Sequence, residues 1–349
     1  MLKRHTIVGF CLLVLFLVYT THAKMPAASA EETYSFVTKW GSLGNYDGML
    51  YVPASIALDL SGNVYVTDTN NNRIEKFSGD GKFLAKWGTY GKAEGQFNLP
   101  TGIAVDSQGN VYVADQSNNR IEEFDSSGKY IKEFDLAPYY PTRIALDSYG
   151  NLYFVDPTKN MVVKFSTNGQ TLARWGSLGS DDGQFDSPVG IAVDSSGYVY
   201  VADTGNNRIE KFTGDGVFVT KWGTEGTGEG QFISPQGITV DSTGHVYVTD
   251  LQNGRVEKFT GTGQFIAQFG THGTGKGKFD SPSGVAVDSS GNVYVTDASY
   301  DNPNVQKFSI SNSTNSVQST VPEFGAVTFL ALTVSIVILV AFTRINMLK

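Results

Sequence analysis

The chain has 349 residues, of which 40% are hydrophobic, with 39 glycines and 11 prolines. This is the composition of a folded protein with a large core, neither disordered nor low in complexity. The formal net charge is −8, and removing the two apolar ends, which hold five basic residues and one acidic residue, gives −12. Such an acidic surface repels phosphate backbones, so we expect no nucleic-acid partner.

Residues 1–30 have the pattern of a secretory signal peptide. Lys3 and Arg4 precede an apolar run over residues 7–19, and Ala-Ser-Ala at 28–30 is a small-x-small cleavage site. We expect cleavage after residue 30, with cleavage after residue 23 or an uncleaved anchor as alternatives. The single cysteine, Cys11, lies in this segment, so we expect no disulfide and no thiol chemistry in the mature chain.

The middle of the chain is built from repeats. Each repeat opens with a proline and an apolar run ending in aspartate. A glycine turn, a second strand ending in aspartate and a polar loop follow, and then a third strand, another glycine turn and a fourth strand. Each unit thus contains four short strands whose apolar residues occupy both faces, which predicts packing on both sides. The prolines are spaced by 47, 41, 47, 47 and 47 residues: Pro53, Pro100, Pro141, Pro188, Pro235 and Pro282.

The register of the repeats predicts how the two ends of the domain meet. A fourth-strand segment, residues 36–40, precedes the first repeat, whereas the sixth repeat ends after its third strand at Phe308. The early segment would therefore complete the last sheet and remove its open edge. We predict an all-β, six-bladed β-propeller of four-stranded blades over residues 31–308, with hydrophobic helices only at the termini. A parallel β-helix is the alternative, but its coils are shorter than 47 residues.

The repeated motifs resemble NHL repeats. The motifs are Pro-x-Gly-Ile-Ala-Val-Asp, Gly-Asn-Val-Tyr-Val-x-Asp and Asn-Asn-Arg-Ile-x-x-Phe, and they recur over residues 36–308. The Trp-Asp and Gly-His signatures of WD40 blades are missing. The resemblance implies an NHL-type propeller. Propellers related to this type include metal-dependent lyases and lactonases.

Two sets of repeated polar residues are interpreted as structural. An aspartate that ends the second strand and an arginine five residues later would order the intervening loop. Met161 and Asn304 replace this arginine in the third and sixth repeats. The pairs are Asp68/Arg73, Asp115/Arg120, Asp203/Arg208 and Asp250/Arg255. The second set suits a glycine-containing turn better than a calcium loop, because it lacks alternating ligands; it comprises Asp59, Asp106, Asp147, Asp194, Asp241 and Asp288.

The sequence predicts no metal site and no catalytic pair. His245 and His272 should lie on opposite faces, separated by a strand about 17 Å long, so they cannot share a zinc ion. The resemblance to calcium lactonases implies carboxylate ligands in the central tunnel. The tunnel-mouth residues follow the prolines and none is acidic: Ala54, Thr101, Thr142, Val189, Gln236 and Ser283. We therefore expect no enzyme, metal or cofactor, with a metal-dependent lyase or lactonase using an unrecognised tunnel-mouth site as the alternative.

Breaks in the repeat predict a binding surface. The loop 135–140 is six residues shorter than its counterparts, and Arg143 replaces the glycine found in four of the six blades. Tyrosines accompany it in loops on the same face, which we call the top face: Tyr46, Tyr51, Tyr90, Tyr139, Tyr140 and Tyr300. Tyrosines with an arginine suit a sugar or a protein loop; the alternative is that the rings fill space. We expect a non-catalytic scaffold whose top face binds a protein or glycan.

The C-terminal segments predict cell-surface attachment. Residues 309–320 form a Ser/Thr/Asn-rich linker with a glycosylation sequon at Asn312. An apolar run over residues 326–342, about 25 Å long as a helix, precedes two basic residues that would lie in the cytoplasm. Residues 321–349, with Pro322-Glu323-Phe324, resemble the PEF-type sorting signals of archaeal surface proteins. This implies processing by an archaeosortase-type transpeptidase; the alternative is a plain single-span anchor. Either way we expect the propeller to be extracellular.

Overall fold

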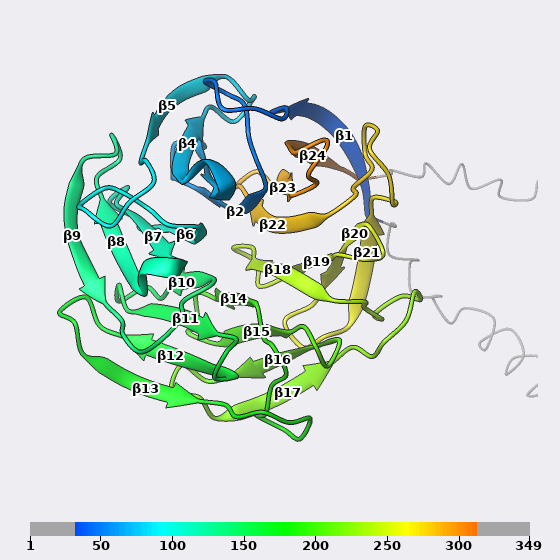
Figure 1. Cartoon of the computed structure of the whole chain (residues 1–349). Helices are drawn as coiled ribbons and strands as arrows, with labels where there is room; N and C mark the ends of the chain where they lie inside the picture. Colours follow the sequence, from blue (N-terminus) through cyan, green and yellow to red (C-terminus); the bar gives the residue numbers. More distant parts are fainter. Residues whose placement is uncertain (1–31, 313–349) are drawn as a thin grey trace, which may run out of the picture. The chain divides into compact units, whose positions relative to one another are not determined.

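In the computed structural model, residues 32–312 form six four-stranded antiparallel sheets around one axis (Figure 1). Each of the first five sheets is one repeat, the sixth combines three strands of the last repeat with the first strand of the chain, and the first strand of every repeat is the innermost (Figure 1). The all-β six-bladed propeller predicted from the repeats is confirmed. The hydrophobic terminal helices, the signal peptide (1–30), the sorting segment (321–349) and nearly all of the linker lie outside the described residues. No helix within residues 32–312 is long and apolar enough to cross a membrane.

The blades follow each other along the chain. Blade one contains β2 (Pro53–Leu58), β3 (Val64–Asp68), β4 (Arg73–Phe77) and β5 (Phe83–Trp87), with the short 3-10 helix η1 (Thr69–Asn71) between β3 and β4. Blade two contains β6 (Pro100–Val105), β7 (Val111–Asp115), η2 (Gln116–Asn118), β8 (Arg120–Phe124) and β9 (Tyr130–Asp135). Blade three contains β10 (Ile144–Leu146), β11 (Leu152–Asp156), β12 (Met161–Phe165) and β13 (Thr171–Trp175).

The remaining blades repeat this order. Blade four contains β14 (Gly190–Val193), β15 (Val199–Asp203), β16 (Arg208–Phe212) and β17 (Phe218–Trp222). Blade five contains β18 (Pro235–Val240), β19 (Val246–Asp250), β20 (Arg255–Phe259) and β21 (Phe265–Phe269). Blade six contains β22 (Pro282–Val287), β23 (Val293–Asp297), β24 (Asn304–Asn312) and β1 (Glu32–Trp40).

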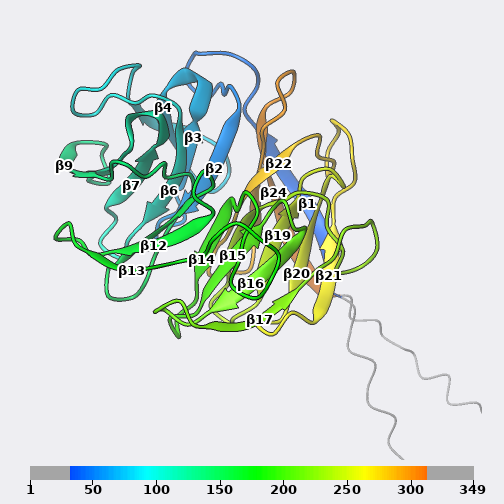
Figure 2. The same ribbon diagram turned by 60° about the horizontal axis from the view of Figure 1, so that its bottom comes forward.

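The strand directions define two faces of the ring, which Figure 2 shows turned by 60°. Pro53 at the start of β2 pairs with Asp68 at the end of β3, and Leu58 pairs with Val64 at the other end of the sheet. We keep the name top face for the end at which the innermost strands begin, and call the opposite end the bottom face. The loops between blades and the loops between second and third strands therefore lie at the top.

The second strands hold the blades together because they are buried on both faces. In β3, β7, β11, β15, β19 and β23 every residue is buried. Each carries a tyrosine whose hydroxyl donates to the aspartate of the turn below it, as Tyr65 does to Asp59 over 3.0 Å. Asp59 also accepts from the backbone N–H groups of Ser61 and Asn63. These aspartates thus complete the bottom turns, and their lone pairs are engaged locally.

The ring closes through β1, as the register predicted. β1 is hydrogen-bonded to β24 as the outer strand of blade six. The Thr33 hydroxyl donates to the Ser311 carbonyl over 2.9 Å, and the rings of Phe36 and Phe308 lie 6.1 Å apart. These two contacts give an antiparallel register. β24 runs on to Asn312, so its last residues include the start of the segment expected as a linker.

Candidate functional site

The innermost strands approach each other so closely at the axis that most carry glycine there. A Cβ added to Gly190 would lie 2.1 Å from the Gln236 carbonyl oxygen, and one added to Gly237 would lie 2.1 Å from that of Ser283. Neither contact is possible for a real side chain. The equivalent positions, two residues after each proline, form what we call the axial ring: Ser55, Gly102, Arg143, Gly190, Gly237 and Gly284.

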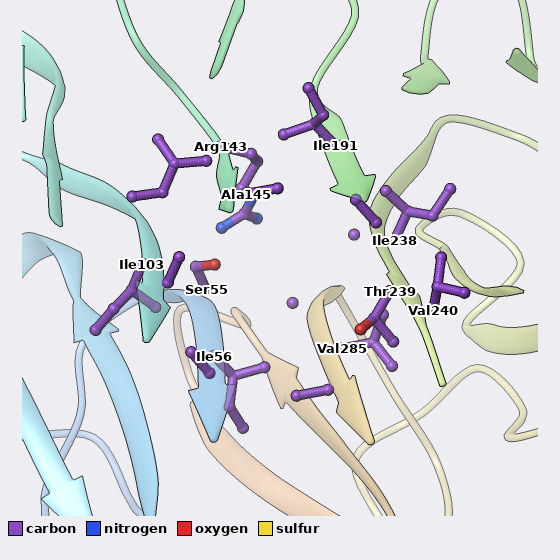
Figure 3. Close-up of a pocket in the computed structure, with 18 of the residues that line it drawn as sticks. Ser55, Ile56, Ile103, Arg143, Ala145, Ile191, Ile238, Thr239, Val240 and Val285 are labelled. Carbon is purple, nitrogen blue, oxygen red and sulfur yellow. The ribbon is translucent and has the colours of Figure 1, made fainter. Parts of the chain in front are cut away.

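Arg143 is the only large side chain of the axial ring, and it crosses the axis. Its Nη1 donates to the Thr101 carbonyl oxygen in blade two over 2.8 Å, and its Nη2 donates to the Ser283 hydroxyl in blade six over 2.7 Å. Figure 3 shows the side chain reaching toward the centre of the ring of strands, near Ser55. One residue of blade three therefore contacts two other blades across the tunnel.

The Arg143 guanidinium has no carboxylate partner among residues 32–312. The side chain is buried, with 7% of the residue exposed. Burial lowers the pKa of the guanidinium to about 10, so it stays charged at neutral pH. A guanidinium has five N–H donors, and two are used here. A buried charge is normally paired, so Arg143 stands apart from the other buried arginines of the chain.

A cavity of about 260 Å³ lies on the axis, next to Arg143 (Figure 3). Its lining begins at the axial ring and follows the innermost strands to their bottom ends, such as Leu58 and Val240. The walls are mainly Ile, Val, Leu, Ala and Gly, with the hydroxyls of Ser55 and Thr239. Arg143 is the one charged residue of this lining. The cavity is thus lined by backbone groups, small or aliphatic side chains and two hydroxyls, with a single positive charge at its top end.

The structure does not bring all the tyrosines predicted for the top face together with Arg143. Tyr139 is half-buried against Phe154, and its hydroxyl accepts from Arg174 on the outer strand of blade three over 3.2 Å. Tyr140 is also half-buried, and its backbone N–H donates to Asp156. The Tyr139 ring is therefore partly used in packing blade three, and the Tyr140 backbone is tied to Asp156, whereas Arg143 points to the axis.

The other predicted tyrosines lie on the top rim. Tyr46, Tyr90 and Tyr300 are 75%, 72% and 65% exposed. Tyr51 is half-buried, and its ring meets that of Tyr300 edge-on at 6.2 Å, which joins blade one to the loop of blade six. Only this last pair is in contact. The rim offers separate aromatic surfaces rather than one closed pocket.

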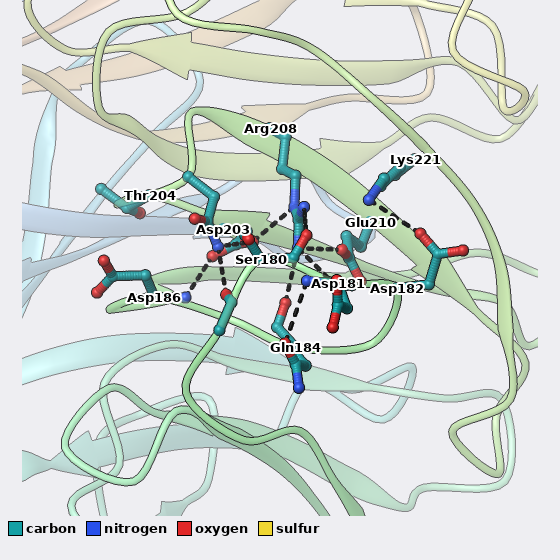
Figure 4. Close-up of polar contacts among 12 residues, drawn as sticks. Ser180, Asp181, Asp182, Gln184, Asp186, Asp203, Thr204, Arg208, Glu210 and Lys221 are labelled. Carbon is teal, nitrogen blue, oxygen red and sulfur yellow. Dashed lines mark hydrogen bonds and ion pairs between the residues drawn. The ribbon is translucent and has the colours of Figure 1, made fainter.

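The repeated Asp–Arg pairs occur as buried clusters that fix the loops between blades. In blade four, Arg208 Nε donates to Asp203 over 2.8 Å, and Nη2 lies 2.6 Å from Glu210 (Figure 4). The same guanidinium donates to the carbonyl oxygens of Asp181 and Gln184 in the preceding loop. The glutamate was missed in the sequence analysis, although its spacing two residues after the arginine repeats. Its counterparts are Glu75, Glu122 and Glu257.

The donors described here do not fit a metal ion. Across residues 32–312 no group of three His, Cys, Asp or Glu side chains is placed to bind one. His245 lies at a bottom turn beside Thr243 and Asp241. His272 is exposed on the top face, 3.8 Å from Asp280. Neither histidine lines the axial cavity, so no reaction step is assigned to a metal.

The sequence matches the model of the virginiamycin B lyase family over residues 45–302. No curated protein matches the chain. The repeats had suggested an NHL-type family; the match supports the same six-bladed architecture under a different family.

Solved structures of enzymes share the fold. Virginiamycin B lyase from Staphylococcus aureus aligns at a TM-score of 0.54 and 18% identity, over 80% of this chain and 99% of that one. A catalytically inactive histidine-to-alanine variant of that lyase with quinupristin aligns at 0.54 and 15%, over 79% and 99%. A gluconolactonase from Xanthomonas campestris aligns at 0.58 and 16%, over 82% and 94%.

The expectation that the chain is not an enzyme is corrected by these findings. The matching family is named for a lyase, and the similar solved structures include a lyase and a lactonase. The expectation rested on the separation of His245 and His272, the absence of acidic residues at the tunnel mouth and the absence of a catalytic pair. It gave no weight to a buried guanidinium, which can also stabilise negative charge in a reaction.

Proposed function

The chain belongs to the virginiamycin B lyase family, and from this premise we propose that it is an enzyme of the lyase or lactonase type that opens a small cyclic ester at the propeller axis. The observation that carries the proposal is the axial cavity of about 260 Å³ with its one charged side chain, Arg143. Apolar pockets with few, well-placed polar groups are the usual sites for small molecules.

Arg143 supplies the electrostatic part of such a reaction. Opening a cyclic ester places negative charge on oxygen: on the carbonyl oxygen when water attacks, or on the carboxylate that departs in an elimination. A fixed, buried guanidinium stabilises either charge more strongly than water does. Its position is held by the Thr101 carbonyl and the Ser283 hydroxyl.

The histidines described in this structure do not supply a proton-transfer group at the axial cavity. The similar lyase is inactive when one histidine becomes alanine, whereas His245 and His272 lie outside the axial cavity here. The proposed reaction therefore depends on Arg143 and a hydroxyl or water, and we assign no histidine a role.

We also propose that the top-face rim recognises a larger protein or glycan that carries the substrate. The support is the exposure of Tyr46, Tyr90 and Tyr300, because exposed tyrosines bind sugars and protein loops. Secretion and cell-surface attachment through the terminal segments remain part of this proposal, and protease digestion of intact cells tests them: the propeller should be cut from outside.

The test is turnover of cyclic esters by the purified chain. Gluconolactone and virginiamycin B are incubated with the wild type and with Arg143→Met, and products are followed by mass spectrometry. We expect ring opening of at least one ester and a loss of at least about 100-fold in kcat/KM for Arg143→Met, the range found for lost oxyanion donors.

Two further variants complete this experiment. Arg174→Met removes an exposed arginine of the outer strand and should leave turnover unchanged. Tyr300→Ala should raise KM for a glycan- or peptide-linked ester with kcat unchanged. Absence of ring opening across a broad panel of lactones and cyclic depsipeptides would remove the proposed function.

A further inference from the structure

Arg143 has hydrogen-bonding capacity that the fold leaves unused. Of its five N–H donors, one meets the Thr101 carbonyl and one meets the Ser283 hydroxyl. The Ser283 hydroxyl accepts this bond, so its own hydrogen is free to donate beside the guanidinium. Both residues are more than nine-tenths buried. Arg143, which lines the axial cavity, thus keeps free donors there, and Ser283 holds the guanidinium from outside the cavity lining.

The surroundings select the charge of the group that could accept these bonds. No acidic residue lines the axial cavity, and its walls are apolar apart from hydroxyl and backbone groups. A buried guanidinium without a carboxylate partner attracts one negative charge. A phosphate carries about −1.5 to −2 at neutral pH, which one guanidinium would leave partly unpaired. A carboxylate carries one charge in a planar group that matches the guanidinium fork.

The volume of the cavity limits the size of the rest of the ligand. A volume of about 260 Å³ compares with about 30 Å³ for one water molecule. The space therefore holds a small organic acid beside Arg143, and a macromolecular chain end could enter only with its last groups.

From these observations we propose that the axial cavity is a binding site for a small carboxylate, held by the Arg143 guanidinium, which the Ser283 hydroxyl positions. The inference rests on the proposed function in one respect: the carboxylate is the acid group that forms when the cyclic ester opens. In hydrolysis, water adds to the carbonyl carbon, the bond to the ring oxygen breaks, and that oxygen leaves with a proton as an alcohol. The acid formed then ionises and remains next to the guanidinium.

Binding is measured directly on the full chain, without turnover. The probes are acetate and gluconate, with acetamide as the uncharged isostere of acetate and with chloride and phosphate at matched ionic strength. Saturation-transfer NMR and the shift of the unfolding temperature report binding. We expect saturable binding of both carboxylates, weakened at least tenfold in Arg143→Met and several-fold in Ser283→Ala, and unchanged in Arg174→Met.

Other results overturn the proposal. Equal binding of acetamide and acetate, stronger binding of phosphate, or unchanged affinity in Arg143→Met would each show that Arg143 serves only to join blades two, three and six. If Arg143→Met does not fold, Arg143→Lys replaces it: lysine keeps the charge but loses the fork, and several-fold weaker carboxylate binding is expected. Unaltered binding in that variant would equally reject the site.

The outcome separates this inference from the proposed function. Carboxylate binding that depends on Arg143, without turnover of any ester, would reject the proposed enzymatic function and support the carboxylate-binding site. Ester opening that persists in Arg143→Met, without carboxylate binding, would reject the carboxylate-binding site and retain an enzymatic function that does not depend on Arg143.

Discussion

At the residue scale, the buried clusters of the blades behave as units. Where the arginine is missing, its glutamate is missing too: blade three has Met161 and Val163, and blade six has Asn304 and Gln306. In blade six, Gln306 accepts from the Gly277 N–H as Glu75 does from Gly48 in blade one. A buried glutamate without its arginine would leave a carboxyl oxygen without a hydrogen-bond partner. The loss of both together supports a structural role for the pair.

The glutamates of these clusters make stability depend on pH. Burial raises the pKa of Glu75 to about 8, above the ordinary 4.5. The folded chain therefore holds a proton that the unfolded chain has lost between about pH 4.5 and 8, so the free energy of unfolding falls as pH rises through this window. Glu75→Gln should make that fall smaller, in urea unfolding at pH 5 and pH 8. The exposed Glu94→Gln is the control. A fall in Glu75→Gln equal to that of the wild type would contradict the assignment.

The repeated sequence pattern indicated the aspartate and the arginine of each cluster but not the glutamate. The Asp–Arg spacing was visible because both residues bound a polar loop. The glutamate lies inside a strand, where a charged residue is expected to face solvent, and only the packing of the preceding loop over it makes it buried. Ser283 was noted as a tunnel-mouth residue, but its contact with Arg143 joins blades three and six, which no local pattern predicts.

At the scale of elements, a glycine turn and a tryptophan join successive blades. Gly216, in the turn between β16 and β17, lies against Trp175 on the outer strand of blade three. An added Cβ would approach the indole to 2.6 Å, and the residue has φ +86°. The same contact recurs between Gly81 and Trp40 and between Gly128 and Trp87. The glycine and the terminal Trp of the repeat, read separately in the sequence, are therefore two sides of one interface.

This interface can be tested with two glycines of one blade. Gly216→Ala should destabilise the chain through backbone strain of about 1 kcal/mol or more and additionally through displacement of Trp175. Gly197, with φ +84° and no atom within 4 Å of an added Cβ, provides the matched control for strain alone. Chemical denaturation should place Gly216→Ala clearly below Gly197→Ala; equal midpoints would mean that the tryptophan contact adds nothing.

At the scale of the whole molecule, the closure by β1 could be predicted from the sequence, whereas the cavity on the axis and its charge could not. Counting repeats and outer-strand markers was enough to pair residues 36–40 with the last blade. The cavity, in contrast, arises from six strands that are far apart in the sequence, and its charge comes from a single departure from the glycine pattern. The departure at Arg143 was noticed, but it was grouped with neighbouring tyrosines that point elsewhere.

Adjacent residues of β1 test how much the closure contributes. Phe36 packs against Phe308, whereas Val37 is 48% exposed. Because loss of a packed aromatic ring costs several times more than loss of an exposed methyl group, Phe36→Ala should lower the free energy of unfolding by about 2 kcal/mol and Val37→Ala by less than about 0.5 kcal/mol. The free energies are measured by equilibrium denaturation. Similar losses for the two variants would mean that the packing of β1 contributes little to the stability of the propeller.

The antiparallel pairing of β1 with β24 also determines how the domain responds to mechanical load. Thr33 and Ser311 are neighbours at the bottom end of this pair, so a force that pulls residues 32 and 312 apart opens the hydrogen bonds one after another, as in unzipping. When the chain is pulled only at residue 312, the load acts on β24. This strand is hydrogen-bonded on both sides, to β1 and to β23, so both sets of hydrogen bonds resist the force. The propeller is therefore weak when stretched between its two ends and strong when held by one.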